Sequence, residues 1–138
     1  MSSLDGILIL AADNDPDHLE ILLYLISQDG GTLKSASSGR EALELLLTCT
    51  PDVLVLDISM PDMDGYELLA TIRGIERLRH IPAVAVTALA YASDRQRCLE
   101  AGFVEHVIKP YEPFGLIQLL SRLVGRSVGG APATESRR

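Results

Sequence analysis

Three short apolar runs and two mixed segments alternate with longer stretches in which apolar residues recur every three or four positions. The apolar runs cover residues 7–12, 53–56 and 81–87, and the mixed segments cover residues 32–36 and 103–109. Short runs that are apolar at almost every position are typical of parallel strands covered on both faces. We therefore predict five strands at these places.

The stretches between the strands have the helical period and conventional end signals. Asp15-Pro16 predicts the start of the first helix and Gly30-Gly31 its end, whereas Pro51 should stop the second helix, which begins at Ser37 or Ser38. The other helices are expected from about Asp64 to Ile75, from about Tyr91 to Ala101 (capped by Gly102) and from Glu112-Pro113 to Gly125. The residues expected to face inward are Leu19, Leu22, Leu23, Ile26, Ala42, Leu43, Leu46, Leu47, Leu68, Leu69, Ile72, Phe114, Ile117, Leu120 and Leu123. Strict strand–helix alternation predicts an α/β fold: a doubly wound, five-stranded parallel sheet with helices on both faces.

Length and composition favour one domain over residues 1–125, followed by a disordered tail over residues 126–138 that is rich in small and polar residues. The net charge of -7 argues against direct binding to nucleic acid. Cys49 and Cys98 both fall in predicted helices, lack metal-site spacing, and are expected to be reduced thiols. No signal peptide or membrane-spanning run is visible, so we expect a cytoplasmic protein with no membrane association.

Four of the predicted strands end on residues that carry chemistry. The first ends at Asp13-Asn14, the third at Asp57, the fourth at Thr87 and the fifth at Lys109. Parallel strands end at one edge of a sheet, which is where ligands bind in open α/β folds. Two carboxylates and an amide oxygen suit Mg²⁺, while Lys109 and Thr87 could hold a phosphoryl group. This set of residues predicts phosphoryl transfer to a carboxylate.

Each of these residues also has an ordinary structural explanation. Asp57, Asp13 and Asn14 could cap the helices that follow them. Thr87 could be a plain strand residue, and Lys109 a solvated strand end. The common placement of all of them at strand ends is what favours a functional site over these separate explanations.

The segments LDISMPDMDG around Asp57, VTALA with Thr87 and HVIKP with Lys109 resemble the response-regulator receiver domain. The resemblance extends over residues 7–124. It implies the strand order 2-1-3-4-5 and a signalling domain of two-component systems, not a conventional enzyme. It also implies phosphorylation of Asp57 by a histidine kinase or a histidine phosphotransfer protein. The Mg²⁺ ligands would be Asp57 and the carbonyl of Ser59, with Asp13 acting through water.

By the same resemblance, Thr87 and Lys109 would bind the phosphoryl group, Ala88 would leave room beside it, and the Lys109–Pro110 bond would be cis. The switch residues would be Thr87 and His106, with His106 turning inward on phosphorylation. This movement would change the surface of the fourth helix, fifth strand and fifth helix, where a downstream protein would bind. The same face could form a weak homodimer of an otherwise monomeric chain. His106 could equally be an ordinary, partly buried histidine.

One residue departs from the family pattern. Where the family has two adjacent acids after the first strand, this chain has Asp13 followed by Asn14. An amide oxygen can bind Mg²⁺ but brings no negative charge, so we expect weaker Mg²⁺ binding and slower phosphorylation and dephosphorylation.

Other functions fit the sequence less well. A degenerate receiver that is never phosphorylated could act as a constitutive protein-interaction domain. An aspartyl phosphatase would need an acid two residues after Asp57, where this chain has Ser59. A flavin-binding protein of similar topology would need a phosphate-binding loop in place of Asp13-Asn14-Asp15, which is acidic.

Overall fold

The five predicted strands form one parallel sheet in the order β2-β1-β3-β4-β5 in this computed structural model, which describes residues 3–88 and 91–125. The strands are β1 (Leu8–Ala12), β2 (Thr32–Ala36), β3 (Val53–Leu56), β4 (Ala83–Thr87) and β5 (Glu105–Ile108). This arrangement confirms the predicted fold class and strand order. The expected tail over residues 126–138 lies outside the described residues.

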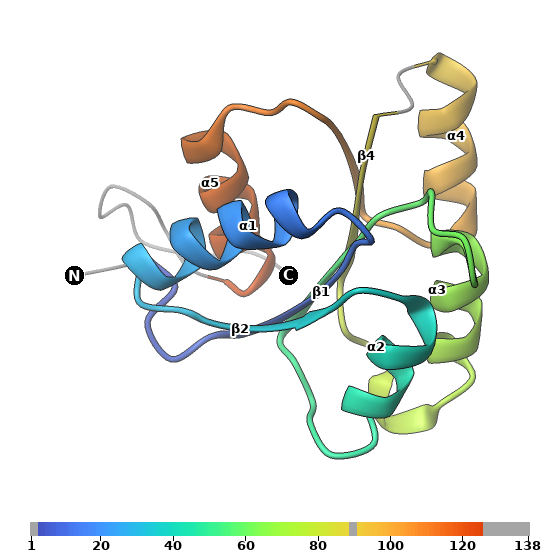
Figure 1. Ribbon diagram of the computed structural model, residues 1–138, viewed down its shortest axis with the longest axis horizontal. Helices are drawn as coiled ribbons and strands as arrows, with labels where there is room; N and C mark the ends of the chain where they lie inside the picture. Colours follow the sequence, from blue (N-terminus) through green and yellow to red (C-terminus); the bar gives the residue numbers. More distant parts are fainter. Residues whose placement is uncertain (1–2, 89–90, 126–138) are drawn as a thin grey trace.

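Helices cover both faces of the sheet. In Figure 1, α1 (Pro16–Gln28) and α5 (Pro113–Leu123) lie on one side, and α2 (Gly39–Leu45), α3 (Gly65–Arg73) and α4 (Ala92–Ala101) lie on the other. A 3₁₀ turn, η1 (Glu76–Leu78), follows α3. Among the described helices, none is both long and apolar enough to cross a bilayer.

The sheet divides the core into two layers because side chains alternate along each strand. Leu54 and Leu56 of β3 pack with residues of α2, α3 and α4, whereas Val53 and Val55 pack with residues of α1 and α5. All four side chains are buried, with at most 2% of the surface of each exposed. Burial on both faces is the reason that β3 is apolar at every position.

Several helix ends are formed by the residues that the sequence indicates. The Asp15 side chain accepts a hydrogen bond from the amide of Asp17 at the start of α1. Asp64 and Glu67 form a capping box at the start of α3. Gly102 ends α4 with φ = 108°, a left-handed conformation that favours glycine.

The prediction for the second helix was wrong at its C-terminal end. α2 ends at Leu45 and a turn follows, well before Pro51. As a result Leu47 lies outside the helix and is 76% exposed, although it was expected to face inward. Cys49 also lies outside a helix, whereas Cys98 lies in α4, as predicted, and is buried there.

Two further residues that were expected to face inward are exposed, Leu23 by 50% and Phe114 by 56%. With 3.6 residues per turn, Leu22 and Ile26 define the inner stripe of α1, and Leu23 lies about 100° away from Leu22. Phe114 likewise lies to the side of the stripe that the other apolar residues of α5 form. The fourth and fifth strands are also shorter than predicted, at residues 83–87 and 105–108.

Candidate functional site

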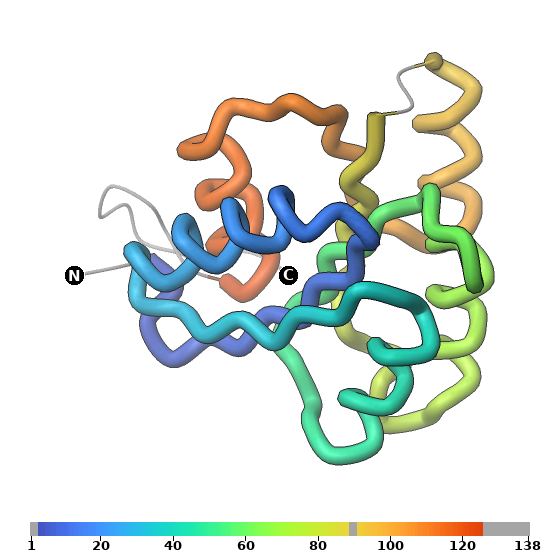
Figure 2. The backbone as a smooth tube through the Cα atoms, viewed as in Figure 1, coloured from blue at the N-terminus to red at the C-terminus, as the bar shows by residue number. Residues whose placement is uncertain are grey.

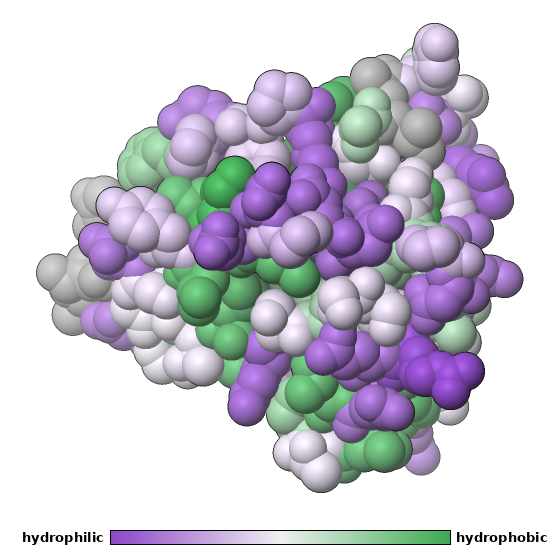
Figure 3. All heavy atoms as spheres, viewed as in Figure 1, coloured by the Kyte–Doolittle hydropathy of each residue, from purple (hydrophilic) through white to green (hydrophobic). Residues whose placement is uncertain are grey.

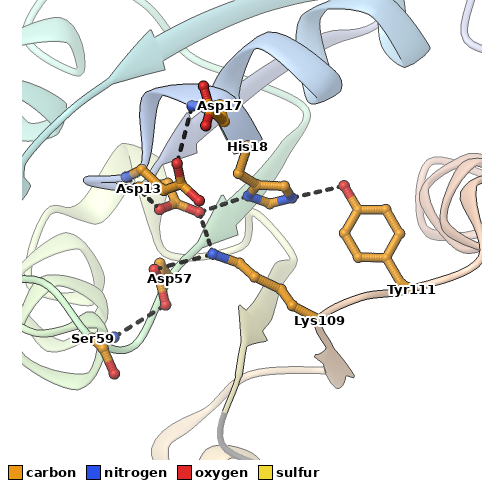
Figure 4. A network of polar contacts seen from close by, with 8 residues as sticks. Asp13, Asp17, His18, Asp57, Ser59, Lys109 and Tyr111 are labelled. Carbon is orange, nitrogen blue, oxygen red and sulfur yellow. Dashed lines mark hydrogen bonds and ion pairs between the residues drawn. The ribbon is translucent and has the colours of Figure 1, made fainter.

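Asp13, Asp57 and Lys109 converge at the carboxyl ends of β1, β3 and β5. Because the strands are parallel, the carboxyl ends of β1, β3, β4 and β5 all lie along one edge of the sheet, and the chain leaves the sheet there (Figure 2). The amide of Asp57 donates to the carbonyl of Ala12 over 2.9 Å, which places Asp57 beside Asp13. Nζ of Lys109 lies 2.9 Å from Oδ2 of Asp13 and 3.4 Å from Oδ2 of Asp57 (Figure 4). The predicted convergence of these three residues is therefore present.

The two carboxyl groups have pKa values that move in opposite directions. Burial raises the pKa of Asp57, and the negative charge of Asp13 raises it further. Burial alone would raise the pKa of Asp13 too, but hydrogen bonds from His18 and Lys109 lower it to about 2. For Lys109, burial would lower the pKa, yet the two carboxylates raise it. At neutral pH the site therefore contains a firmly charged Asp13 and a more basic Asp57.

Asp13 is held by two further donors. Nδ1 of His18 lies 2.6 Å from Oδ2 of Asp13, and the amide of Asp15 donates to Oδ1 over 2.9 Å. Nε2 of His18 lies 2.7 Å from the hydroxyl of Tyr111. Neither His18 nor Tyr111 was predicted from the sequence. The available signal was that His18 occupies the same helical stripe as Leu22 and Ile26, so it had to be buried.

The loop between β3 and α3 carries Ser59 and is anchored at several points. The amide of Ser59 donates to Oδ1 of Asp57 over 3.1 Å. Asp62 accepts hydrogen bonds from the amides of Gly39 and Arg40 at the start of α2, over 3.2 and 3.0 Å. At Gly65 a Cβ atom would lie 2.6 Å from the carbonyl oxygen of Asp57, so no other residue fits there without movement of the backbone.

The oxygen atoms at this edge of the sheet are suited to binding Mg²⁺. Asp13 and Asp57 supply two carboxylate groups of the hard-oxygen kind that Mg²⁺ prefers, and a cation between them would offset the repulsion that helps to raise the pKa of Asp57. Within residues 3–88 and 91–125, no cluster of three or more His, Cys, Asp or Glu side chains could hold a metal ion. Further ligands would have to be the exposed Asn14 amide, the carbonyl of Ser59 and water, which Mg²⁺ readily retains.

The remaining predicted site residues lie at the ends of β4 and β5. Thr87 is buried, and its carbonyl accepts a hydrogen bond from the amide of Lys109 over 2.9 Å. The Lys109–Pro110 bond is cis, as the resemblance implied. His106 is already buried, with 7% of its surface exposed. The expected inward turn of its ring on phosphorylation would therefore not start from an outward position. Its Nε2 has no hydrogen-bond partner among the described residues.

A pocket of about 450 Å³ opens next to Lys109 between α1 and the start of α5. Its residues are Asp15, Asp17, His18, Ile21, Lys109, Pro110, Tyr111 and Pro113. Hydrophilic side chains gather across the region where α1 begins (Figure 3). The site therefore lies beside a pocket to which both charged and apolar side chains contribute.

Comparison with known proteins identifies a family. Residues 9–121 match the family model described as "Response regulator receiver domain". An uncharacterized 14.6 kDa protein of Leptolyngbya boryana is 38% identical over 88% of this chain and 93% of its own length. The sensor histidine kinase CheAY of Helicobacter pylori is 33% identical over 88% of this chain. The solved receiver domain of the sensor histidine kinase PA1611 from Pseudomonas aeruginosa superposes with a TM-score of 0.80 at 28% identity, covering 87% of this chain and 98% of that one.

The relatives differ in how much of their length this chain spans. It covers 93% of the Leptolyngbya protein but only 15% of CheAY, so it corresponds to one part of that kinase. The PA1611 structure contains a magnesium ion coordinated in its active site cleft.

Proposed function

Because the chain belongs to the response regulator receiver domain family, we propose that it accepts a phosphoryl group on Asp57 from a histidine kinase or a histidine phosphotransfer protein. The observation that carries this proposal is the position of the Lys109 ammonium between the carboxylates of Asp13 and Asp57. An ammonium group held between two carboxylates at the carboxyl ends of parallel strands is suited to binding phosphoryl oxygens. The proposal includes a cytoplasmic setting, as expected from the sequence.

In the proposed reaction, a carboxylate oxygen of Asp57 attacks the phosphorus of a phosphohistidine. A P–O bond forms, the P–N bond breaks, and its electron pair goes to the imidazole nitrogen that leaves. Burial makes Asp57 more basic and so a better nucleophile. The product is an acyl phosphate on Asp57, and its hydrolysis by water returns the free carboxylate and releases inorganic phosphate.

The charge that develops on the phosphoryl oxygens has to be neutralised. Lys109 would leave its contact with Asp57 and bind a phosphoryl oxygen, and the hydroxyl of Thr87 would donate to another. A bound Mg²⁺ would supply further neutralisation of these oxygens. Asp57, the carbonyl of Ser59, Asn14 and, through water, Asp13 would hold the metal. Because Asn14 replaces an acid of the family pattern, this set of ligands has one negative charge fewer. We therefore expect it to bind Mg²⁺ more weakly than a family member that has both acids.

We further propose that Thr87 and His106 pass the change to the surface of α4, β5 and α5. Movement of Thr87 toward the phosphoryl group would change the space behind it, and the ring of His106, which is buried on the neighbouring strand β5, would repack in response. This surface carries the apolar side chains of Leu99, Val104, Ile108 and Phe114, which are between 39% and 56% exposed. It is suited to a downstream protein partner or a weak homodimer, and not to nucleic acid.

Acetyl phosphate with Mg²⁺ tests the proposal. We expect an acid-labile mass increase of one phosphoryl group in the wild-type protein and none in Asp57→Ala. A second experiment offers phosphorylated histidine kinases and follows transfer to Asp57. If neither donor modifies the wild-type chain, the receiver is degenerate and binds its partners constitutively.

A further inference from the structure

Two residues that the proposed reaction does not use form a hydrogen-bonded chain that ends on Asp13. The hydroxyl of Tyr111 lies 2.7 Å from Nε2 of His18, and Nδ1 of His18 lies 2.6 Å from Oδ2 of Asp13 (Figure 4). The ring of Tyr111 meets that of His18 edge to face, with centroids 5.5 Å apart. The chain joins α1 to the segment that follows β5.

The two ends of this chain have defined charges. Burial and the nearby charge of Asp13 raise the pKa of Tyr111 to about 12, so the phenol keeps its proton. Asp13 is a carboxylate and can only accept, so Nδ1 of His18 donates to it. The contact between Tyr111 and Nε2 holds the other side of the ring and so fixes its orientation.

The consequence for Asp13 is a fixed carboxylate plane. Oδ2 accepts from both His18 and Lys109, while Oδ1 accepts from the amide of Asp15. A carboxylate has about four acceptor positions, so three donors leave roughly one direction open. Without His18, Asp13 would lose one of the three donors that hold its carboxylate in this orientation.

We propose that His18 and Tyr111 are positioning residues that hold the Asp13 carboxylate in place for the water-mediated contact with Mg²⁺. The inference rests on the proposed function, since it assigns these residues to the same metal site. It has particular weight in this chain because Asn14 supplies no charge. With only two carboxylates at the site, the orientation of each has a larger effect on the affinity for the ion.

The test measures Mg²⁺ binding directly on the unphosphorylated protein, by calorimetry and by the amide NMR shifts of Asp57 and Ser59. We expect His18→Leu, which keeps the bulk but removes the donor, to weaken Mg²⁺ binding about tenfold, the lower end of effects for groups that orient metal ligands. His18→Asn retains an N–H near the position of Nδ1 and should recover most of the affinity. Tyr111→Phe should weaken binding severalfold, and should have no further effect when combined with His18→Leu.

The imidazole ¹⁵N spectrum provides a readout that packing alone would not change. In the wild-type protein the proton on Nδ1 of His18 should be hydrogen-bonded and protected from exchange with water, whereas Tyr111→Phe should make it exchange faster. Tyr24→Phe, at an exposed tyrosine on the same helix α1, is the matched control and should leave both readouts unchanged.

Mg²⁺ affinity in His18→Leu that equals or exceeds that of the wild type, in a folded protein, would overturn the inference and make His18 a packing residue. If His18→Leu fails to fold, Tyr111→Phe decides, because it removes one oxygen from a ring that stays in place. Absence of Mg²⁺ binding in the wild-type protein is a separate result, since it contradicts the proposed metal site and this inference with it. Phosphorylation of Asp57 with normal Mg²⁺ affinity in all variants would retain the proposed function and reject the positioning role.

Discussion

Asp13 and Asp57 share a single cation, with Nζ of Lys109 lying 0.5 Å closer to Oδ2 of Asp13 (2.9 Å) than to Oδ2 of Asp57 (3.4 Å). Asp13 also accepts from His18 and the amide of Asp15, whereas Asp57 accepts from the amide of Ser59. The asymmetry gives the two acids opposite roles in the free protein. Asp13 is stabilised as a carboxylate, whereas burial and the charge of Asp13 raise the pKa of Asp57.

Removal of the two charges should have opposite effects on stability. At pH 7 without Mg²⁺, Asp57→Asn should raise the melting temperature by a few degrees, because it relieves repulsion with Asp13 and the burial of a charge. Asp13→Asn should lower it, because His18 and Lys109 lose their acceptor. Thermal unfolding of the three proteins measures both effects. Equal shifts in one direction would contradict the different environments of the two acids.

The pH dependence of stability should follow the same assignment. The pKa of Asp13 falls from 3.8 to about 2 on folding, so its stabilisation is complete above its unfolded pKa and is lost as pH falls toward about 2. Asp57 has a raised folded pKa, so its charge costs stability at neutral pH and protonation in acid relieves that cost. Acid unfolding of Asp13→Asn should therefore be less steep than that of the wild type below about pH 4, as measured by circular dichroism.

Restoration of the missing acid should strengthen the metal site. In Asn14→Asp, a third carboxylate joins Asp13 and Asp57, and we expect Mg²⁺ to bind about tenfold more tightly, since affinity rises with the number of charged ligands. Phosphorylation by acetyl phosphate and loss of the phosphoryl group should both become faster. Calorimetry and phosphorylation time courses give the two readouts. An unchanged Mg²⁺ affinity would show that Asn14 is not part of the site.

Gly65 should not tolerate a side chain. A Cβ atom there would lie 2.6 Å from the carbonyl oxygen of Asp57 and 2.9 Å from Cα of Ile58, and both are backbone atoms. We expect Gly65→Ala to lower the free energy of unfolding by about 1–3 kcal/mol, as overpacking does. Gly115→Ala, in the exposed part of α5, meets only Oε1 of the capping residue Glu112, at 3.3 Å, and should cost much less than Gly65→Ala. Urea unfolding of the two variants would contradict this account if both lost the same stability.

His106 should be a site of low local stability. Its Nε2 is buried without a hydrogen-bond partner among the described residues, and an unsatisfied buried polar group costs about 1–3 kcal/mol. His106→Phe should therefore raise the melting temperature while weakening the response of α4, β5 and α5 to phosphorylation. The response can be followed by amide NMR shifts in these elements with and without beryllofluoride. A lower melting temperature would indicate that the ring nitrogen is satisfied in solution.

The sequence was sufficient for the sheet and for the convergence of Asp13, Asp57 and Lys109. Strand ends are marked by a change from apolar to polar residues, and parallel topology brings those ends together. The contacts of His18 and Tyr111 could not be predicted in this way. They lie 93 positions apart in the chain, and their meeting depends on how α1 and the start of α5 pack on the sheet. Leu47 was misplaced for a different reason, because a turn ended α2 where the apolar pattern continued.

The attachment of Asp62 to the amides of Gly39 and Arg40 has an entropic consequence. An unattached loop would have to become ordered when a cation reaches the carbonyl of Ser59, at a cost of about 1–2 kcal/mol for each residue fixed. Here that ordering has already taken place when α2 forms. Asp62→Ala, which removes the acceptor of these two bonds, should thus affect how readily the site responds to its ion.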